Sequence, residues 1–194
     1  MLRTNVHLLS YVEQLYKELT SKDIILKEYP KGSFIFNQSE KSSKVIIIKE
    51  GFVKCFFSEE NGKDFIVEFL GEGEIAGEIE AIRNIQCLCH IEALSDIQVY
   101  QFSTNTFRLL MKQNPQFNQL LINELAERII NTSSRASLQQ VYSIKNGLHK
   151  LITLQERQHL RISKADMAAY LGVDIRSLNR VLKTIKETDS ELLE

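Results

Sequence analysis

The sequence predicts an α+β fold in which a roll of short strands is followed by a long helix and a helical C-terminal unit. Between residues 24 and 102, short β-branched and aromatic runs alternate with turn residues, as in the strands of a sheet. Residues 116–137 contain neither Gly nor Pro and repeat apolar residues at helical spacing. Residues 162–183 hold two short amphipathic patterns on either side of a glycine, which is typical of a helix-turn-helix.

The composition is that of an ordinary globular protein. Of the 194 residues, 43% are hydrophobic and 25% are charged. No run of about 18 apolar residues occurs, so we expect no membrane span. The N-terminal pattern carries acidic residues and no small-residue cleavage site, which indicates a helix rather than a signal peptide. Three cysteines do not make a disulfide framework, and we therefore expect a cytoplasmic protein.

Positive charge is concentrated in one segment. The net charge is −1, but residues 135–186 hold ten Lys and Arg side chains against three Asp and Glu side chains. The segments before and after this one are acidic. Binding to a polyanion requires such a basic surface, and its coincidence with the helix-turn-helix pattern predicts contact with double-stranded DNA.

The N-terminal part predicts one helix followed by strands. Residues 5–20 place apolar side chains on one stripe, as in an amphipathic helix. Asn61-Gly62 predicts a hairpin, because a two-residue turn of this kind needs positive φ. The close spacing of the strands favours a double-stranded β-helix of the jelly-roll kind, with a short helix after it at residues 104–113. The predicted strand runs are IILKEY (24–29), SFIF (33–36), KVIIIKEGFVKCFF (44–57), DFIVEFL (64–70), CLCHIEAL (87–94) and IQVYQF (97–102).

The long helix has more apolar surface than one neighbour would cover. We expect one side to pack on the roll and another to pack on a second copy of the chain. A two-fold dimer suits a helix-turn-helix protein, since DNA half-sites are bound in pairs. A helix that packs only within its own chain is the alternative. The predicted dimer-helix residues are Phe117, Leu121, Leu125 and Ile129.

Residues 162–183 give the clearest functional signal. Ser163 and Asp166 have the spacing of a helix N-cap and its partner. Gly172 suits a sharp turn, and Asp174 suits the N-cap of the second helix. A helical hairpin with a solvated basic face is the plainer alternative. The predicted DNA-binding residues are Ser163, Lys164, Asp174, Ile175, Arg176, Ser177, Asn179, Arg180 and Lys183.

The order of these elements resembles the Crp/Fnr family of bacterial transcription regulators. The resemblance rests on residues 31–36 (KGSFIF), 46–54 (IIIKEGFVK), 70–78 (LGEGEIAGE) and 162–183. It implies a homodimeric, sequence-specific DNA-binding regulator with RNA polymerase and a small-molecule effector as further candidate partners. The implied domains are a cyclic-nucleotide-binding-like sensor at 1–113, a dimerisation helix and hinge at 114–137, and a DNA-binding domain at 138–194.

The recognition helix departs from the family pattern. Arg180 holds the place of the last Arg of a frequent family motif and suits a bidentate contact to guanine. Ile175 and Arg176 differ from that motif, so the preferred half-site should differ. The family usually follows this helix with a two-stranded wing, which we expect to be reduced or missing here. A weakly DNA-binding protein that dimerises with other regulators is therefore the alternative function.

The effector pocket departs from the family pattern as well. In cyclic-nucleotide-binding members, a Gly-Glu pair is followed about ten residues later by Arg and a small hydroxyl residue, which hold the cyclic phosphate. Gly77 and Glu78 match the pair, but Cys87 and Leu88 stand at the second position. A buried phosphate without that cation costs several kcal/mol, so the pattern argues against cyclic AMP and leaves the effector unknown.

Metal and catalytic chemistry are not expected. Cys87 and Cys89 alternate along a predicted strand, with Cys55 and His90 as further candidates for a redox or metal pair. Core packing is the favoured interpretation, because a free cysteine behaves as a small hydrophobic residue and two thiolates are few for a tight metal site. A metal-dependent enzyme on the roll would need clustered His and carboxylate ligands, and only His90 lies there.

Overall fold

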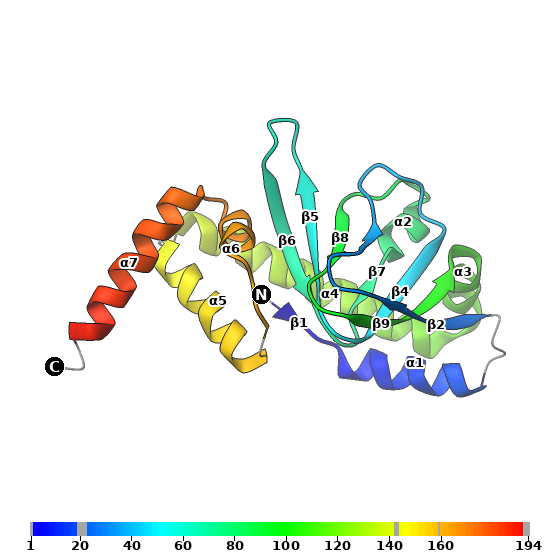
Figure 1. Ribbon diagram of the computed structural model, residues 1–194. Coiled ribbons are helices and arrows are strands. Elements are labelled where there is room, and N and C mark those ends of the chain that lie inside the picture. Colours follow the sequence, from blue (N-terminus) through cyan, green and yellow to red (C-terminus); the bar gives the residue numbers. More distant parts are fainter. Residues whose placement is uncertain (1, 19–22, 142–143, 159, 192–194) are drawn as a thin grey trace.

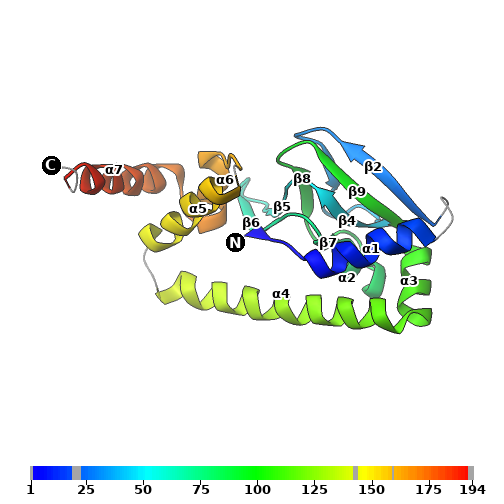
Figure 2. The ribbon, with the colours of Figure 1, turned by 90° about the horizontal axis from the view of Figure 1, so that it is seen from below.

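The structure of the protein, a computed structural model, describes residues 2–18, 23–141, 144–158 and 160–191. It consists of an N-terminal roll of two sheets, a group of C-terminal helices and a long helix that extends along both (Figures 1 and 2). The predicted α+β architecture is confirmed.

Two sheets enclose the core of the roll. The first contains, in spatial order, β1 (Leu2–Arg3), β6 (Asp64–Leu70), β5 (Val53–Ser58), β8 (His90–Ala93) and β3 (Phe34–Phe36). The second contains β2 (Ile24–Tyr29), β9 (Ile97–Ser103), β4 (Lys44–Glu50) and β7 (Ile75–Ala76). Only the pair β1–β6 is parallel among the pairings of the described residues. β4 is buried along four consecutive residues, which explains its continuous apolar run.

The predicted strands are largely confirmed, with two corrections. The run 44–57 forms two strands, because the chain turns at Gly51 with a φ of +91°; a Cβ there would lie 2.5 Å from the Asp96 carbonyl oxygen. The run 87–94 forms a strand only from His90 onward. Cys87 lies in the preceding loop, where its backbone pairs with residues 39 and 40. The expected alternation of Cys87 and Cys89 along one strand is therefore wrong.

The helices are α1 (Val6–Glu18), α2 (Glu78–Arg83), α3 (Thr104–Gln113), α4 (Pro115–Val141), α5 (Ile144–Gln158), α6 (Lys164–Leu171) and α7 (Ile175–Glu191). α4 runs without a break through residues 131–134, where the sequence predicted a hinge, and beyond residue 137. The polar residues of this segment do not interrupt the helix. α7 extends past residue 186, and no strand follows it within the residues described up to 191.

A continuous apolar cluster joins the roll to the C-terminal helices. It contains Ile66 and Phe69 of β6, Met167 and Tyr170 of α6, and Leu178 of α7. The two parts therefore share one core. No helix of the described residues is long and apolar enough to cross a bilayer.

Candidate nucleic-acid interface and sensor pocket

The helix-turn-helix forms where its capping residues predict it. Ser163 Oγ accepts a hydrogen bond from the Asp166 backbone N–H at 3.0 Å, and α6 ends at Gly172 in the left-handed conformation, with a φ of +68°. Asp174 caps α7 by accepting hydrogen bonds from the backbone N–H of Ser177 at 2.7 Å and from its hydroxyl at 3.0 Å. These bonds, led by the one from the Ser177 N–H, hold the pKa of Asp174 below its usual value.

One face of α7 is open to solvent. Leu178 and Ile185 point into the core, while Ile175 in the first turn of α7 is 48% exposed. Ser177 is half-buried beside the Asp174 cap. A shallow concavity lies at the N-terminal end of this face, bounded by Asp174, Ile175, Arg176, Ser177 and Arg180. The predicted residues that lie exposed on or beside this face are Ser163, Lys164, Asp174, Ile175, Arg176, Asn179, Arg180 and Lys183.

The opposite side of the helix-turn-helix is docked on the roll. Lys54 of β5 places its Nζ 2.7 Å from Asp166 Oδ1 and 3.1 Å from Glu92 Oε2. The ring of Phe69 in β6 lies with its centroid 5.2 Å from that of Tyr170 in α6. These contacts fix α6 against the sheet and leave the outer face of α7 free.

Arg135 of α4 connects three elements at this junction. Its guanidinium donates hydrogen bonds to the Ile66 carbonyl oxygen at 2.8 Å and to that of Val67 in β6. It also donates to the Tyr170 carbonyl oxygen at 2.6 Å and lies 3.9 Å from the centroid of the Tyr170 ring. A cavity of about 390 Å³ opens beside it, with Arg3, Glu68, Glu74, Lys150 and Tyr170 among its lining residues.

Glu78, which was predicted to line the effector pocket, forms an ion pair with α4. Glu78 begins α2, directly after Gly77, and is only 1% exposed. Its carboxylate pairs with Arg128 of α4, which also donates to the Ile75 carbonyl oxygen at 3.0 Å. Burial raises the pKa of Glu78, and the charge of Arg128 opposes that shift. The other two predicted pocket residues, buried Cys87 and exposed Leu88, add no positive charge.

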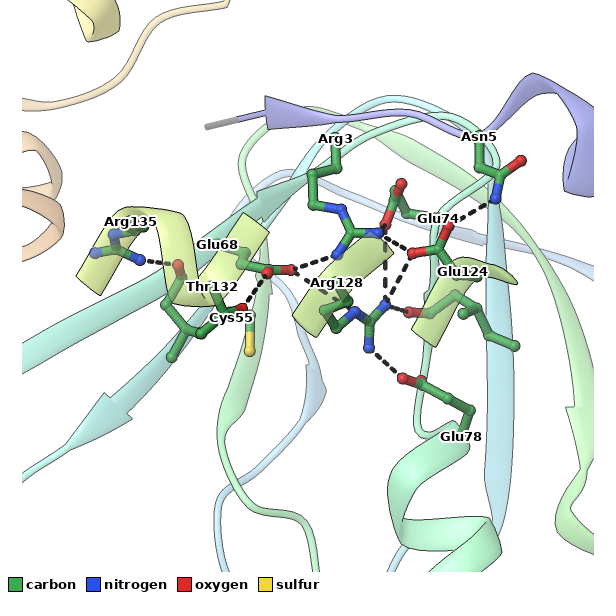
Figure 3. Close-up of polar contacts among 12 residues, drawn as sticks. Arg3, Asn5, Cys55, Glu68, Glu74, Glu78, Glu124, Arg128, Thr132 and Arg135 are labelled. Carbon is green, nitrogen blue, oxygen red and sulfur yellow. Dashed lines mark hydrogen bonds and ion pairs between the residues drawn. The ribbon is translucent and has the colours of Figure 1, made fainter. Parts of the chain in front are cut away.

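This ion pair belongs to a buried cluster of six charged side chains (Figure 3). Arg3 of β1 lies with its Nη1 3.5 Å from Glu68 Oε2 and its Nη2 3.4 Å from Glu74 Oε2, and it pairs with Glu124. Arg128 Nη2 lies 3.7 Å from Glu124 Oε1. The cluster thereby links β1, β6, α2 and α4. Its members are Arg3, Arg128, Glu68, Glu74, Glu78 and Glu124, and we call it the charge cluster.

Carboxylates outnumber guanidiniums in the charge cluster, and Glu74 shows the consequence. Its side chain is 1% exposed, and its Oε2 accepts no hydrogen bond among the described residues. Burial, followed by the charge of Glu124, raises the pKa of Glu74 to about 8, although Arg3 and Arg128 oppose the shift. Glu74 therefore carries a proton at neutral pH.

The structure corrects the predicted dimer face of α4. Phe117 and Leu121 are 0% and 1% exposed and pack in the core of their own roll, and Leu125 is partly buried against the same core. Ile129 is 67% exposed. The apolar side chains that α4 exposes are Ile122, Ile129 and Ile130. The prediction was wrong for Phe117 and Leu121 because a helix of wide apolar coverage does not reveal which stripe faces inward.

Comparisons with known proteins show which proteins the chain resembles. Residues 26–114 match the cyclic nucleotide-binding domain family. The cAMP-activated global transcriptional regulator CRP of Pasteurella multocida is 25% identical over 173 residues, which is 84% of this chain and 83% of that protein. Over most of its length, the chain is therefore similar to regulators of the Crp/Fnr family.

Solved structures of the Crp/Fnr fold superpose on most of the chain. The c-di-GMP responsive global regulator CLP of Xanthomonas campestris covers 93% of this chain and 92% of its own, with a TM-score of 0.78 at 16% identity. A CRP-family transcriptional regulator of Thermus thermophilus covers 84% of this chain and 85% of its own, with a TM-score of 0.72 at 16% identity. These likenesses confirm the fold. The relatives that match more than four fifths of the chain are transcription regulators and not enzymes.

Several important residues of the chain were not identified by sequence analysis. Arg3, Glu74 and Arg135 act through partners far away in sequence, and no local pattern marks them. Glu124 and Arg128 carried a weak signal, because they are charged residues four apart on a helix face that otherwise packs on the roll. A buried charge on an apolar face generally requires a partner, which would have pointed to the roll.

The raised pKa of Glu74 predicts how stability depends on pH. The native state retains a proton that the unfolded state releases above its ordinary pKa of 4.5, so the free energy of unfolding should fall as the pH rises from about 4.5 to about 8. Glu74→Gln removes this titration. We expect the variant to lose less stability between pH 5.5 and 8.5 than the parent, by about 1–3 kcal/mol.

Urea denaturation followed by far-UV circular dichroism across this pH range measures the effect. The matched control is Glu72→Gln, which alters an exposed neighbour outside the charge cluster. It should keep the parent's pH profile. A Glu74→Gln profile identical to the parent's would show that Glu74 is ionised throughout.

Proposed function

We propose that the protein is a homodimeric, sequence-specific DNA-binding transcription regulator. The observation that carries the proposal is the arrangement of α7. Its apolar face packs on α5 and α6, whereas its basic outer face, with Arg176, Arg180 and Lys183, is exposed. A helix of this kind can enter the major groove with the N-terminal residues closest to the base edges.

The roles of the residues follow from their chemistry. Arg180 suits a bidentate contact to guanine, and Ile175 suits the methyl group of thymine. Lys164 suits a backbone phosphate, which fixes position without selecting sequence. Asp174 is occupied as the cap of α7, so it orients the helix rather than binding phosphate. RNA polymerase is a further partner in this proposal.

Dimerisation would use the exposed stripe of α4. Ile122 and Ile129 are one heptad apart and are 51% and 67% exposed, with Ala126 exposed between them. This spacing is typical of helices that pair along a two-fold axis. A partner helix there would remove apolar area from water without disturbing the buried face of α4.

The effector, if the roll binds one, is proposed to differ from cyclic AMP. The carboxylate of Glu78 is engaged by Arg128, so it is not free to hold a ribose hydroxyl. Cys87 and Leu88 supply no cation for a cyclic phosphate. Relatives named as cAMP-activated have a similar sequence, but here Cys87 and Leu88 stand where the family pattern places the Arg and hydroxyl residue that hold the phosphate.

The DNA-binding proposal predicts different defects for two exposed basic residues. Selection from a random duplex pool should enrich a two-fold symmetric site. On that site Arg180→Ala should relax base preference by about 1–3 kcal/mol per half-site, since it loses a base contact. Lys164→Ala should weaken binding to all sequences and reduce the salt slope by about 1 per protomer. Fluorescence anisotropy at several salt concentrations measures both effects.

Failure to enrich any duplex would favour the alternative, a protein that binds DNA weakly and dimerises with other regulators. Equal defects of the two variants on all sequences would contradict the assignment of Arg180 to base contacts.

The dimer proposal predicts that Ile129→Asp produces monomers. A carboxylate in the centre of an apolar pairing stripe loses hydration without gaining a partner. Sedimentation velocity should show a dimer for the parent and a monomer for the variant at the same concentration. Leu109→Asp is the matched control, because Leu109 of α3 is 53% exposed outside the stripe. A dimeric Ile129→Asp protein with an unchanged circular dichroism spectrum would rule out this face.

The absence of a phosphate-binding cation predicts that cyclic AMP does not stabilise the protein. A ligand that binds only the native state raises the unfolding temperature in proportion to RT ln(1 + [L]/Kd). Differential scanning fluorimetry with about 1 mM cyclic AMP should therefore leave the midpoint unchanged. A dose-dependent increase in the midpoint would contradict this part of the proposal.

A further inference from the structure

The structure brings together two cysteines that are 34 residues apart in sequence. The Sγ atoms of Cys55 in β5 and Cys89, in the bend before β8, lie 2.7 Å from each other. Both side chains are half-buried and free. A disulfide bond is about 2.05 Å long, so the two sulfur atoms need to approach by only about 0.7 Å to form one.

We propose that Cys55 and Cys89 form a redox site that closes reversibly into a disulfide when the protein meets a hydroperoxide. The pairing of β5 with β8 already holds the sulfur atoms in contact, so little chain entropy remains to be lost when the bond forms. Core packing alone, the interpretation favoured from sequence, requires no such approach of the two thiols.

The two cysteines have different roles in this reaction. The hydrogen bond with Cys89 and then burial raise the pKa of Cys55 well above its usual range, so Cys55 stays protonated. Cys55 lies in a strand that is paired on both sides, whereas Cys89 lies in the bend before β8, so we assign Cys89 as the residue that meets the oxidant. Its thiolate attacks the O–O bond of the hydroperoxide, takes one oxygen to become a sulfenic acid, and releases an alcohol, or water from hydrogen peroxide, once the leaving oxygen gains a proton.

Cys55 completes the disulfide. Its sulfur attacks the sulfenic sulfur of Cys89, and the displaced hydroxyl leaves as water with the Cys55 proton. Two thiols and one hydroperoxide thus give one disulfide, one alcohol and one water. An external dithiol returns the pair to its reduced form by exchange.

The third cysteine is a less suitable partner. Cys87 is 5% exposed in the loop before β8, and burial raises the pKa of its thiol. Its backbone N–H donates to the Glu40 carbonyl oxygen, and its carbonyl oxygen accepts from the Ser39 N–H. These two hydrogen bonds hold the loop in place. Cys87 therefore serves as the control cysteine in tests of the Cys55–Cys89 pair.

The position of the pair suggests how the disulfide affects the helix-turn-helix. Cys55 lies opposite Glu68 in the β5–β6 ladder, and Glu68 belongs to the charge cluster that holds α4 (Figure 3). The adjacent Lys54 forms the ion pair with Asp166 of α6. A covalent link at Cys55 constrains β5 beside Glu68, which pairs with Arg128 of α4, and next to Lys54, which pairs with α6. The expected change in DNA affinity rests on the proposed function. Formation of the disulfide does not depend on that function.

Mass spectrometry of the full chain tests the redox site. The protein is treated with hydrogen peroxide, its remaining thiols are alkylated, and it is digested without reductant. We expect a cross-linked peptide joining Cys55 to Cys89, lighter by two hydrogen atoms and lost on treatment with dithiothreitol. Cys87→Ser should keep the link. Cys55→Ala should instead accumulate a sulfenic acid on Cys89 that dimedone traps.

Other products would overturn the inference. These are a link that involves Cys87, a link between two copies of the chain, or direct conversion of Cys89 to sulfinic acid in the parent protein. Cys89→Ser, at a half-exposed site, provides a second variant that should fold and form no intramolecular link.

A second measurement separates the disulfide from its effect on DNA. Affinity for the selected duplex is compared before and after peroxide treatment, with Cys89→Ser as the control. We expect a change of about fivefold or more in the parent and none in the control. Equal affinities of cross-linked and reduced protein would refute the regulatory route. If the reduced protein binds no duplex, the proposed function fails, and the cross-link alone decides the redox site.

Discussion

The burial of Arg128 among carboxylates is the constraint on which the rest of the structure depends. A guanidinium removed from water requires nearby negative charge, and Arg128 finds it on α2, on β6 and one turn earlier on its own helix. Because these carboxylates come from separate elements, the ion pairs fix α4 in one rotation about its axis. That rotation places Phe117 and Leu121 in the core and Ile129 outside.

The charge cluster also bears on the proposal that the roll does not bind cyclic AMP. A pocket for a phosphate needs surplus positive charge, whereas this one holds more carboxylates than guanidiniums. The raised pKa of Glu74 lessens this surplus of negative charge without removing it, because four carboxylates face two guanidiniums. The roll therefore resembles a cyclic nucleotide-binding domain in its fold, while the charge cluster beside it favours protons or cations over anions.

Sequence patterns predicted those parts of the fold that depend on local chemistry. The caps at Ser163 and Asp174 and the turn at Gly172 depend on neighbours within a few residues, and each was found as expected. The division of the run 44–57 and the inward stripe of α4 depend on distant parts of the chain. Gly51 turns where Asp96 approaches it, and Phe117 is buried by Phe107, neither of which periodicity reveals. Proximity of Cys55 to Cys89 likewise arises only from the pairing of β5 with β8.

The apolar cluster shared by the roll and the C-terminal helices bears on how the chain folds. Tyr170 and Met167 share an apolar cluster with residues of β6, which is paired with a strand on each side. The C-terminal unit is therefore not an autonomous folding domain in the arrangement described. Separated from the sheet, it would expose aromatic and aliphatic surface that favours association with other chains. During synthesis the sensor emerges first, and it would act as the template on which the last three helices assemble.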